Sequence, residues 1–258
     1  MIGIFDSGSG GLSVLKEIIR LLPGEEYVYY SDNANCPYGE KSAEFIQDRA
    51  RKIAGLLIAK GAQIIVVACN TATAAAIATL RAEFPVKFIG MEPAVKPAAL
   101  SSRTGRIGVL ATAGTLKASK YLSTREKFED GTMIVEHVGQ GFVELVENGV
   151  LDGPEAEQTV RDSVQPLIDA GVDRIVLGCT HYPFLRKVIE RVAGPDIQII
   201  DPAPAVARQL VNVMRKEGLL KEAALQSDAK PVPRIELIAS GPEDSARRIL
   251  STFAEAKD

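Results

Sequence analysis

The chain contains two closely similar octets, IIVVACNT at residues 64–71 and RIVLGCTH at residues 174–181. Each is an apolar run that ends in a small residue, a cysteine and two polar residues, and a helical pattern follows each one. Nearly continuous apolar runs are typical of parallel strands covered on both faces. The octets therefore predict two buried strands with Cys69 and Cys179 at their carboxyl ends. A chance likeness between two buried strands is the alternative.

Short apolar runs alternate with longer helical patterns over the rest of the chain as well. We expect strands at residues 2–5, 27–30, 64–68, 86–90, 107–110, 133–138, 174–178, 197–200 and 235–238. Helices are expected at residues 12–22, 42–60, 74–83, 117–128, 154–170, 184–192, 203–216 and 243–253. This alternation predicts an α/β fold with mostly parallel sheets flanked by helices.

The chain also shows signs of two similar domains. IGIFDS at residues 2–7 resembles IGVLAT at residues 107–112, which is a second internal sequence similarity besides that of the octets. Prolines follow two strands, in EPAVKP at 92–97 and DPAP at 201–204, and mark turns where the chain crosses between domains. We therefore expect one discontinuous α/β domain from residues 1–95 plus 205–258, and a second from residues 96–204. Residues 226–233 are expected to form an exposed loop.

Composition and charge exclude several classes of function. Thirty Lys and Arg against 33 Asp and Glu give a net charge of −3, so the basic surface that nucleic acid or an anionic membrane requires is missing. The absence of Trp and the 5% of aromatic residues argue against base stacking. No apolar stretch approaches the ~20 residues of a membrane-spanning helix. No secretory signal precedes the first strand and the cysteines are odd in number, which together predict a reduced, cytoplasmic location.

The two strand-end cysteines are the main candidates for chemistry. In open α/β sheets, ligands bind beyond the carboxyl ends of the strands, and a thiol near a helix N-terminus is favoured as thiolate. Thr71 and Thr180 have positions suited to helix capping or ligand binding. Burial as a small apolar residue is the alternative for a single cysteine, but two in matched contexts favour chemistry. Cys36 lacks the strand-end context and is interpreted as incidental.

Two thiols suit the inversion of a stereocentre by proton transfer. Such a reaction needs a base on one face of the substrate and an acid on the other, and the two exchange roles for the other enantiomer. Carboxylate or imidazole groups can move protons to and from each sulfur. Asp6, at the end of the first strand, and His181, two residues after Cys179, are placed to do so.

Other chemistries of cysteine fit less well. A phosphatase loop needs Arg six residues after its cysteine, where this chain has Ala75 and Leu185. A zinc site needs four clustered ligands, and the sequence contains no Cys-x-x-Cys pair, so no metal is expected. A hydrolase with Cys179 as nucleophile would need a base in contact with the sulfur. The sequence alone leaves open whether His181, only two residues away, can make that contact.

Glycines follow the first strand, in SGSGG at residues 7–11. A P-loop fails at residues 39–42, where Glu40 stands in the place of the lysine, and the glycines at 7–11 do not match the dinucleotide-binding pattern, which would need a glycine at Ser13. They are compatible with backbone N–H groups that receive a small anionic group at a helix start. A plain tight turn explains the glycines equally well.

Together these segments resemble the glutamate racemase family. The resemblance rests on IFDSGSGGL at 4–12, DNANCPYG at 32–39, ACNTA at 68–72, EPA at 92–94 and LGCTHYP at 177–183. It implies two pseudo-symmetric α/β domains with the active site in the cleft between them. It also implies interconversion of L- and D-glutamate without a cofactor, to supply D-glutamate for peptidoglycan synthesis and the cell wall.

The resemblance also implies roles for single residues. Cys69 and Cys179 would be the two acid/base thiols, assisted by Asp6, His181 and Glu147. The residues implied to hold the substrate are Asp6, Ser7, Tyr38, Gly39, Asn70, Thr71, Thr112, Thr115, Thr180 and His181. At Gln140-Gly141 the chain departs from the Cys-Pro that family members often carry, and a solvated helix-end acid is the alternative reading of Glu147.

Partners and alternatives complete the predictions. The resemblance implies a homodimer that binds a small-molecule substrate, with no nucleic acid and no membrane as partner. The nearest alternative is a racemase of another acidic amino acid, such as aspartate. An alternative from a different class is a non-catalytic two-domain protein that binds a small anion.

Overall fold

The computed structural model describes residues 1–221 and 234–255, so the loop expected at residues 226–233 lies outside the described residues. The chain divides into two compact units. Unit 1 consists of Met1–Met91 and Ala203–Asp258, and unit 2 consists of Glu92–Pro202. Each unit is built around one parallel sheet.

The sheet of unit 1 has the strand order β4-β3-β1-β2-β9, with parallel neighbours throughout. Its strands are β1 (Ile2–Asp6), β2 (Glu26–Ser31), β3 (Ile64–Val67), β4 (Lys87–Gly90) and β9 (Arg234–Ala239). The central strands β1 and β3 are buried along their whole length. This burial explains their unbroken apolar sequence, because neither face meets water.

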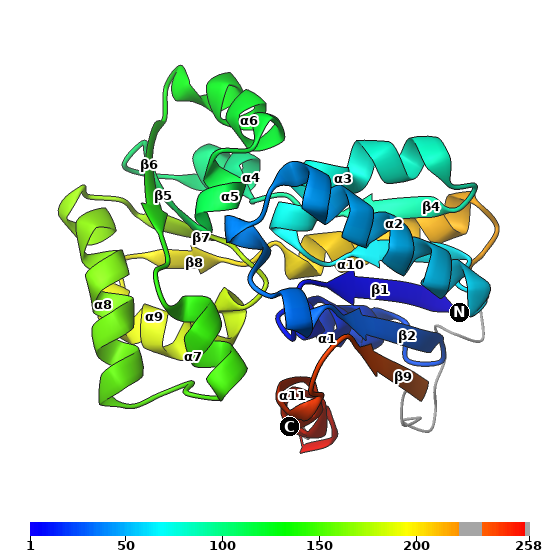
Figure 1. Cartoon of the computed structure of the whole chain (residues 1–258). Coiled ribbons are helices and arrows are strands. Elements are labelled where there is room, and N and C mark those ends of the chain that lie inside the picture. The colour runs from blue at the N-terminus through cyan, green and yellow to red at the C-terminus, as the bar shows by residue number, and fades with distance from the viewer. Residues whose placement is uncertain (222–233, 256–258) are drawn as a thin grey trace. The chain divides into compact units, whose positions relative to one another are not determined.

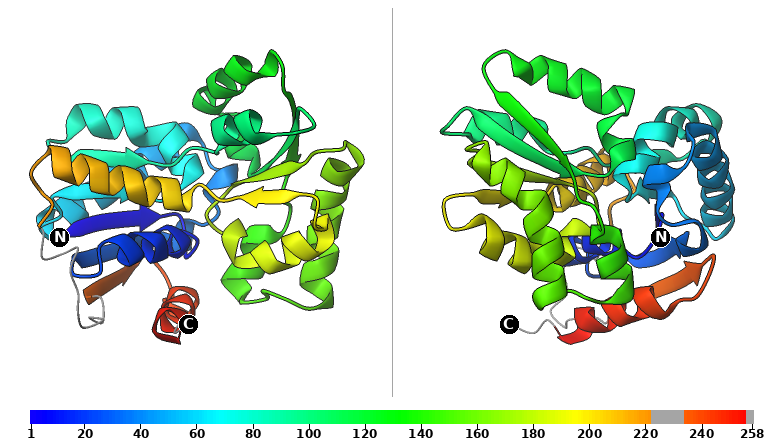
Figure 2. Two further views of the ribbon diagram at one scale, coloured as in Figure 1. Left: turned by 180° about the vertical axis from the view of Figure 1, so that it is seen from behind. Right: turned by 60° about the vertical axis from the view of Figure 1, so that its left-hand side comes forward.

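Helices cover both faces of this sheet (Figures 1 and 2). They are α1 (Leu12–Leu21), α2 (Ala43–Ala59), α3 (Asn70–Glu83), α10 (Ala203–Lys216) and α11 (Asp244–Glu255), with short 3-10 turns η1 (Asn33–Asn35) and η2 (Tyr38–Glu40). The helices α2 and α3 pack together on one face, around a core that includes Phe5, Val28 and Val67. The helices α1 and α10 pack together on the other face.

The sheet of unit 2 has the strand order β6-β5-β7-β8, again all parallel. Its strands are β5 (Arg106–Ala111), β6 (Met133–Val138), β7 (Arg174–Gly178) and β8 (Gln198–Ile200). Its helices are α4 (Val95–Ser101), α5 (Ala113–Leu116), α6 (Ser119–Glu129), α7 (Phe142–Asn148), α8 (Pro154–Asp169) and α9 (Arg186–Ala193), with a 3-10 turn η3 (Tyr182–Leu185). The helices α4 and α6 cover one face, and α8 packs with α9 on the other (Figure 1).

The two sheets share one topology. In unit 1 the first four strands lie in the order β4-β3-β1-β2, and in unit 2 the corresponding strands lie in the order β8-β7-β5-β6. The internal similarities of the sequence therefore fall on equivalent strands: β3 corresponds to β7, each directly before a cysteine, and β1 corresponds to β5. The predicted fold class, two mostly parallel sheets flanked by helices, is confirmed.

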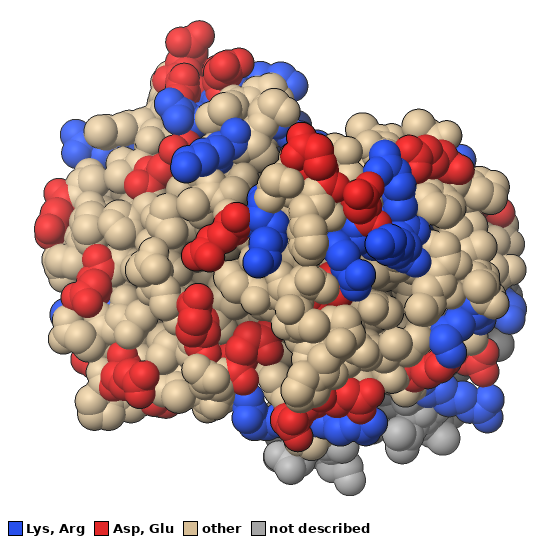
Figure 3. Space-filling view, viewed as in Figure 1, with Lys and Arg blue, Asp and Glu red and all other residues tan. Residues whose placement is uncertain are grey.

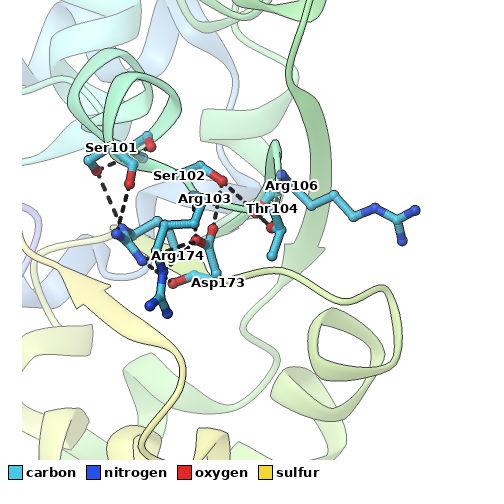
Figure 4. Close-up of polar contacts among 8 residues, drawn as sticks. Ser101, Ser102, Arg103, Thr104, Arg106, Asp173 and Arg174 are labelled. Carbon is cyan, nitrogen blue, oxygen red and sulfur yellow. Dashed lines mark hydrogen bonds and ion pairs between the residues drawn. The ribbon is translucent and has the colours of Figure 1, made fainter.

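A polar cluster around the buried Asp173 and Arg174 joins α4 to the amino end of β7 in unit 2 (Figure 4). Asp173 accepts hydrogen bonds from the Ser102 hydroxyl and the Arg103 backbone N–H, both at 2.6 Å. Arg174 donates to the backbone oxygen of Ser101, the last residue of α4, at 2.7 Å. Burial alone would raise the pKa of Asp173, but these hydrogen bonds lower it. This cluster lies at the opposite edge of the sheet from Cys179.

Some helices differ from the sequence prediction. The helix predicted from residue 74 begins at Asn70, because the cysteine before it acts as its N-cap. The prolines at 92–97 do not mark only a turn: α4 begins at Val95, and Pro97 lies in its first turn, where a missing N–H breaks no helical hydrogen bond. The short helices α4, α5 and α7 were not predicted, since four to seven residues carry too little periodicity.

The surface of the molecule shows no dominant charge on the face drawn in Figure 3, where acidic and basic side chains are interspersed. No helix within residues 1–221 and 234–255 combines the length and the apolar character needed to cross a membrane.

Candidate active site

Three predicted residues meet at the carboxyl edge of the unit 1 sheet, and we call Asp6, Ser7 and Cys69 the Cys69 cluster. The neighbouring strands β1 and β3 pair Phe5 with Val67, so the residues that follow them leave the sheet side by side. The thiol of Cys69 donates to the Ser7 hydroxyl at 3.7 Å. That hydroxyl in turn donates to the Asp6 carboxylate at 3.4 Å. All three side chains are buried.

Cys69 is the N-cap residue of α3. Its sulfur accepts the backbone N–H of Ala72 at 3.4 Å, and its backbone oxygen accepts that of Thr73 at 2.9 Å. The N–H groups at a helix start and the helix dipole both favour negative charge. The sequence-based expectation of a thiol at a helix N-terminus therefore holds for Cys69, and this contact by itself favours the thiolate.

The glycine loop binds a carboxylate from its own chain. The backbone N–H of Gly11 donates to the Asp6 carboxylate at 2.7 Å, directly before α1. A Cβ atom at Gly11 would lie 2.7 Å from the Cβ of Asp6 and 2.9 Å from the hydroxyl of Tyr29. A glycine is thus required here by close packing. The helix start that was expected to receive a small anionic group holds the Asp6 side chain in place.

Four further residues predicted to bind substrate lie in the same unit: Tyr38, Gly39, Asn70 and Thr71. Tyr38 and Gly39 form the turn η2, and the Tyr38 side chain is buried in the same apolar cluster as Cys69. Asn70 and Thr71 open α3 and are both buried. Among the residues that the structure describes, neither amide atom of Asn70 has a hydrogen-bond partner. A buried amide without hydrogen-bond partners destabilises the folded protein, so a polar ligand is expected to bind it.

The second cysteine has a different environment in unit 2, where we call Glu147, Cys179 and His181 the Cys179 cluster. The Nδ1 atom of His181 lies 3.8 Å from the sulfur of Cys179. The Nε2 atom of the same ring lies 2.7 Å from a carboxylate oxygen of Glu147, at the end of α7. His181 is only 2% exposed. The imidazole therefore connects the thiol to a carboxylate, which also answers whether His181 can reach Cys179.

No α-helix starts at Cys179, so the expectation of a helix N-terminus beside this thiol is wrong. The chain first forms the 3-10 turn η3 from Tyr182, and α9 begins only at Arg186. The tyrosine packs edge-on against Phe142 of α7, with ring centroids 4.9 Å apart. This contact holds α7, and with it Glu147, against the segment that carries His181.

The remaining predicted residues of unit 2 are Thr112, Thr115 and Thr180. Thr112 is the N-cap of α5 and accepts the backbone N–H of Thr115 at 3.3 Å. It follows β5, whose last residue, Ala111, pairs with Gly178 directly before Cys179. Thr112 and Cys179 thus leave neighbouring strands at the same edge. Thr180 lies between the cysteine and the histidine and is buried.

One buried acid at this edge of unit 1 is absent from the predicted site residues. Asp32 directly follows β2, the neighbour of β1, and its side chain is fully buried. The strand-end rule that points to Asp6 also applies to Asp32.

Within either unit, the described side chains of His, Cys, Asp and Glu form no group of three at metal-binding distance.

Comparison with known proteins finds relatives over nearly the whole chain. Residues 2–210 match the family described as Asp/Glu/Hydantoin racemase. The glutamate racemase of Pseudomonas putida KT2440 is 44% identical over 258 residues, which covers 100% of this chain and 95% of the relative.

Solved structures agree with this match. Glutamate racemase isoform RacE1 from Bacillus anthracis aligns with a TM-score of 0.85 and 32% identity, over 100% of this chain and 94% of that one. Escherichia coli glutamate racemase, solved with L-glutamate and the activator UDP-MurNAc-Ala, aligns with a TM-score of 0.84 and 31% identity, over 98% and 94% of the two chains.

Proposed function

The chain belongs to the Asp/Glu/hydantoin racemase family, and on that premise we propose that it is a glutamate racemase that interconverts L- and D-glutamate. The observation that carries the proposal is a cysteine at the carboxyl end of equivalent strands in two sheets of one topology, each with its own proton-carrying neighbours. The substrate, glutamate, is inferred from the relatives named glutamate racemase.

The proposed reaction moves one proton at the α-carbon. A thiolate removes the α-proton from one face of glutamate, which breaks the C–H bond and forms an S–H bond. The electron pair left on the substrate takes a proton from the other thiol on the opposite face, and that thiol becomes a thiolate. No net proton is consumed, and the reverse reaction uses the same two groups in exchanged roles.

In the Cys69 cluster, the helix start would stabilise the thiolate, and Ser7 and Asp6 would form a short path for the proton. The carboxylate of Asp6 is fixed by Gly11 and so remains aligned with Ser7.

In the Cys179 cluster, His181 would move the proton. A carboxylate only accepts hydrogen bonds, so the contact with Glu147 places a proton on Nε2 and leaves Nδ1 of a neutral ring facing the sulfur. The imidazole can then accept the thiol proton, and Glu147 stabilises the imidazolium that forms.

Substrate binding falls to the polar residues around the thiols. We assign the two carboxylates and the ammonium of glutamate to Ser7, Tyr38, Gly39, Asn70, Thr71, Thr112, Thr115 and Thr180. The buried amide of Asn70, which lacks partners among the described residues, is the contact that most requires a ligand.

The biological setting is part of the proposal. We infer a cytoplasmic homodimer that needs no metal and no organic cofactor and supplies D-glutamate for peptidoglycan synthesis. An absorbance spectrum of the purified protein, in which bound pyridoxal phosphate would be visible, checks the cofactor. Sedimentation equilibrium checks the dimer.

The decisive assay for the function is interconversion of L- and D-glutamate, followed with α-hydrogen exchange in D2O by proton NMR. We expect both activities with either enantiomer, and much slower turnover of L- and D-aspartate measured in parallel. Preferred turnover of aspartate would reassign the substrate. No exchange with any acidic amino acid would favour a protein that only binds a small anion.

A further inference from the structure

Asp32 is a buried carboxylate to which the proposed reaction assigns no role. Its exposed fraction is 0%, and its backbone N–H donates to the backbone oxygen of Asp6 at 3.0 Å. Asp32 therefore lies beside the strand end that carries the Cys69 cluster. Its own oxygens are fully engaged, which shows that it does not face the substrate as a free acid.

The partners of Asp32 come from three helical elements and from Ser240, which follows β9. The hydroxyl of Tyr38 in η2 donates to Oδ2 at 2.5 Å. Arg49 of α2 donates to both oxygens, through Nε at 2.9 Å and Nη2 at 2.6 Å. Asn35 of η1 donates to Oδ1 at 3.1 Å. Such a forked, charge-assisted pair fixes geometry in a way that a single contact does not.

The charges of this group balance. Burial alone would raise the pKa of Asp32, but the hydrogen bonds from Arg49, Tyr38 and Asn35 lower it below its usual value. Asp32 is thus ionised at neutral pH, and the guanidinium of Arg49 offsets its charge. Without Arg49, an uncompensated carboxylate would lie in the same buried region as the Cys69 thiolate.

Tyr38 is the link between this pair and the thiol. Its side chain is 1% exposed and belongs to the apolar cluster that contains Cys69. Burial, Asp32 and the charge of Cys69 all raise the pKa of the Tyr38 phenol, so it stays neutral. Its hydroxyl proton is used in the hydrogen bond to Asp32. Tyr38 is therefore no acid or base in the reaction, but its ring and the turn that it shares with Gly39 are held beside the sulfur.

We propose that Asp32 and Arg49 are positioning residues: they hold the hydroxyl of Tyr38 and thereby fix the turn of residues 38–40 for substrate binding next to Cys69. This inference rests on the proposed function. A buried ion pair often stabilises a fold no more than apolar residues of the same size would. The geometry that the pair imposes on Tyr38 therefore explains its presence better than stability does.

Helix α2 offers a matched control. Arg51, two residues after Arg49, makes a similar forked pair with Glu83, but at the surface, where its side chain is 37% exposed. Exposed pairs of this kind contribute little to stability. Arg51→Met removes a forked pair from the same helix without touching Tyr38.

The test is a double-mutant cycle on steady-state racemisation with Tyr38→Phe, Asp32→Asn and the double variant. We expect each single variant to raise KM for glutamate about tenfold with a smaller loss in kcat, because a binding group is displaced. The double variant should be no worse than the worse single variant, since Asp32 acts through the Tyr38 hydroxyl. Arg51→Met should match the unmodified protein.

Several results would overturn the inference. Multiplicative losses in the double variant would show that Asp32 acts independently of Tyr38, and unchanged KM and kcat in Asp32→Asn would remove its role. If circular dichroism shows that Asp32→Asn does not fold, Arg49→Lys, which keeps the charge and loses the fork, takes its place in the cycle. Failure of the unmodified protein to racemise glutamate would refute the proposed function and this inference with it.

Discussion

Cys69 and Cys179 follow equivalent strands of two sheets with one topology, yet different groups reach the two sulfur atoms. Cys69 caps a helix and contacts a serine hydroxyl backed by Asp6. Cys179 caps no helix and faces an imidazole backed by Glu147. The repeated fold thus places each thiol in the same position, while the groups that contact it differ. A helix start can favour a thiolate by itself, whereas a thiol without one needs a base beside it.

The largest expected effect is common to both clusters. Cys69→Ser and Cys179→Ser should each lower kcat for racemisation by about a thousandfold or more, because a serine hydroxyl is a far weaker acid–base partner than a thiol near neutral pH. Polarimetry in both directions measures it. Retention of full activity by either variant would refute the scheme.

The second effect separates the clusters. His181→Asn should lower kcat about a hundredfold, since it removes the base beside Cys179. Ser7→Ala should lower it about tenfold or less, because the helix start still supports the Cys69 thiolate when one hydrogen bond is lost. Rates of both variants, measured side by side, decide the comparison. An equal loss in the two would mean that Ser7 is as essential to Cys69 as the imidazole is to Cys179.

Glu147 is expected to act only through His181. Glu147→Gln should lower kcat about tenfold, because an amide no longer stabilises the imidazolium. In a His181→Asn background the same change should have little further effect. Glu144→Gln, on the exposed side of α7, is the matched control. Independent losses in the double variant would show that Glu147 contacts the substrate or supports the fold instead.

The smallest effect on catalysis is expected at the opposite edge of the unit 2 sheet. Asp173→Asn should leave kcat and KM unchanged and lower the free energy of unfolding by about 2 kcal/mol, since it weakens hydrogen bonds to a buried charge. The folded-state pKa of Asp173 is lowered, so its contribution is present above the unfolded pKa of about 4 and is lost as the pH falls through the folded value. Thermal melts of both proteins between neutral pH and pH of about 3 measure the difference. A constant difference at all pH values would contradict this account.

The sequence predicts the strands better than the clusters. Strands such as β3 and β7 are found where expected, because strands buried on both faces consist of almost continuous apolar residues. The contact between Glu147 and His181 spans 34 residues and depends on α7, a seven-residue helix with little periodicity of its own. It could be inferred only from family resemblance.

The unequal surroundings of the two thiols were also hidden in the sequence. The two octets look alike through the cysteine, but Pro183 follows Cys179 closely, and the chain forms a 3-10 turn there instead of an α-helix. Asp32 was missed because its partners, Tyr38 and Arg49, meet it only in the folded chain.

Racemisation in D2O at low conversion shows whether two different thiols serve the two faces of glutamate. Starting from L-glutamate, we predict that the D-glutamate formed carries deuterium at the α-carbon, while the remaining L-glutamate keeps its protium. The thiol that donates to the product face carries a deuteron from the solvent, whereas the other carries the protium that it removed from the substrate. Product that retains protium, or deuterium that enters substrate and product equally from the start, would indicate a single base and contradict the account.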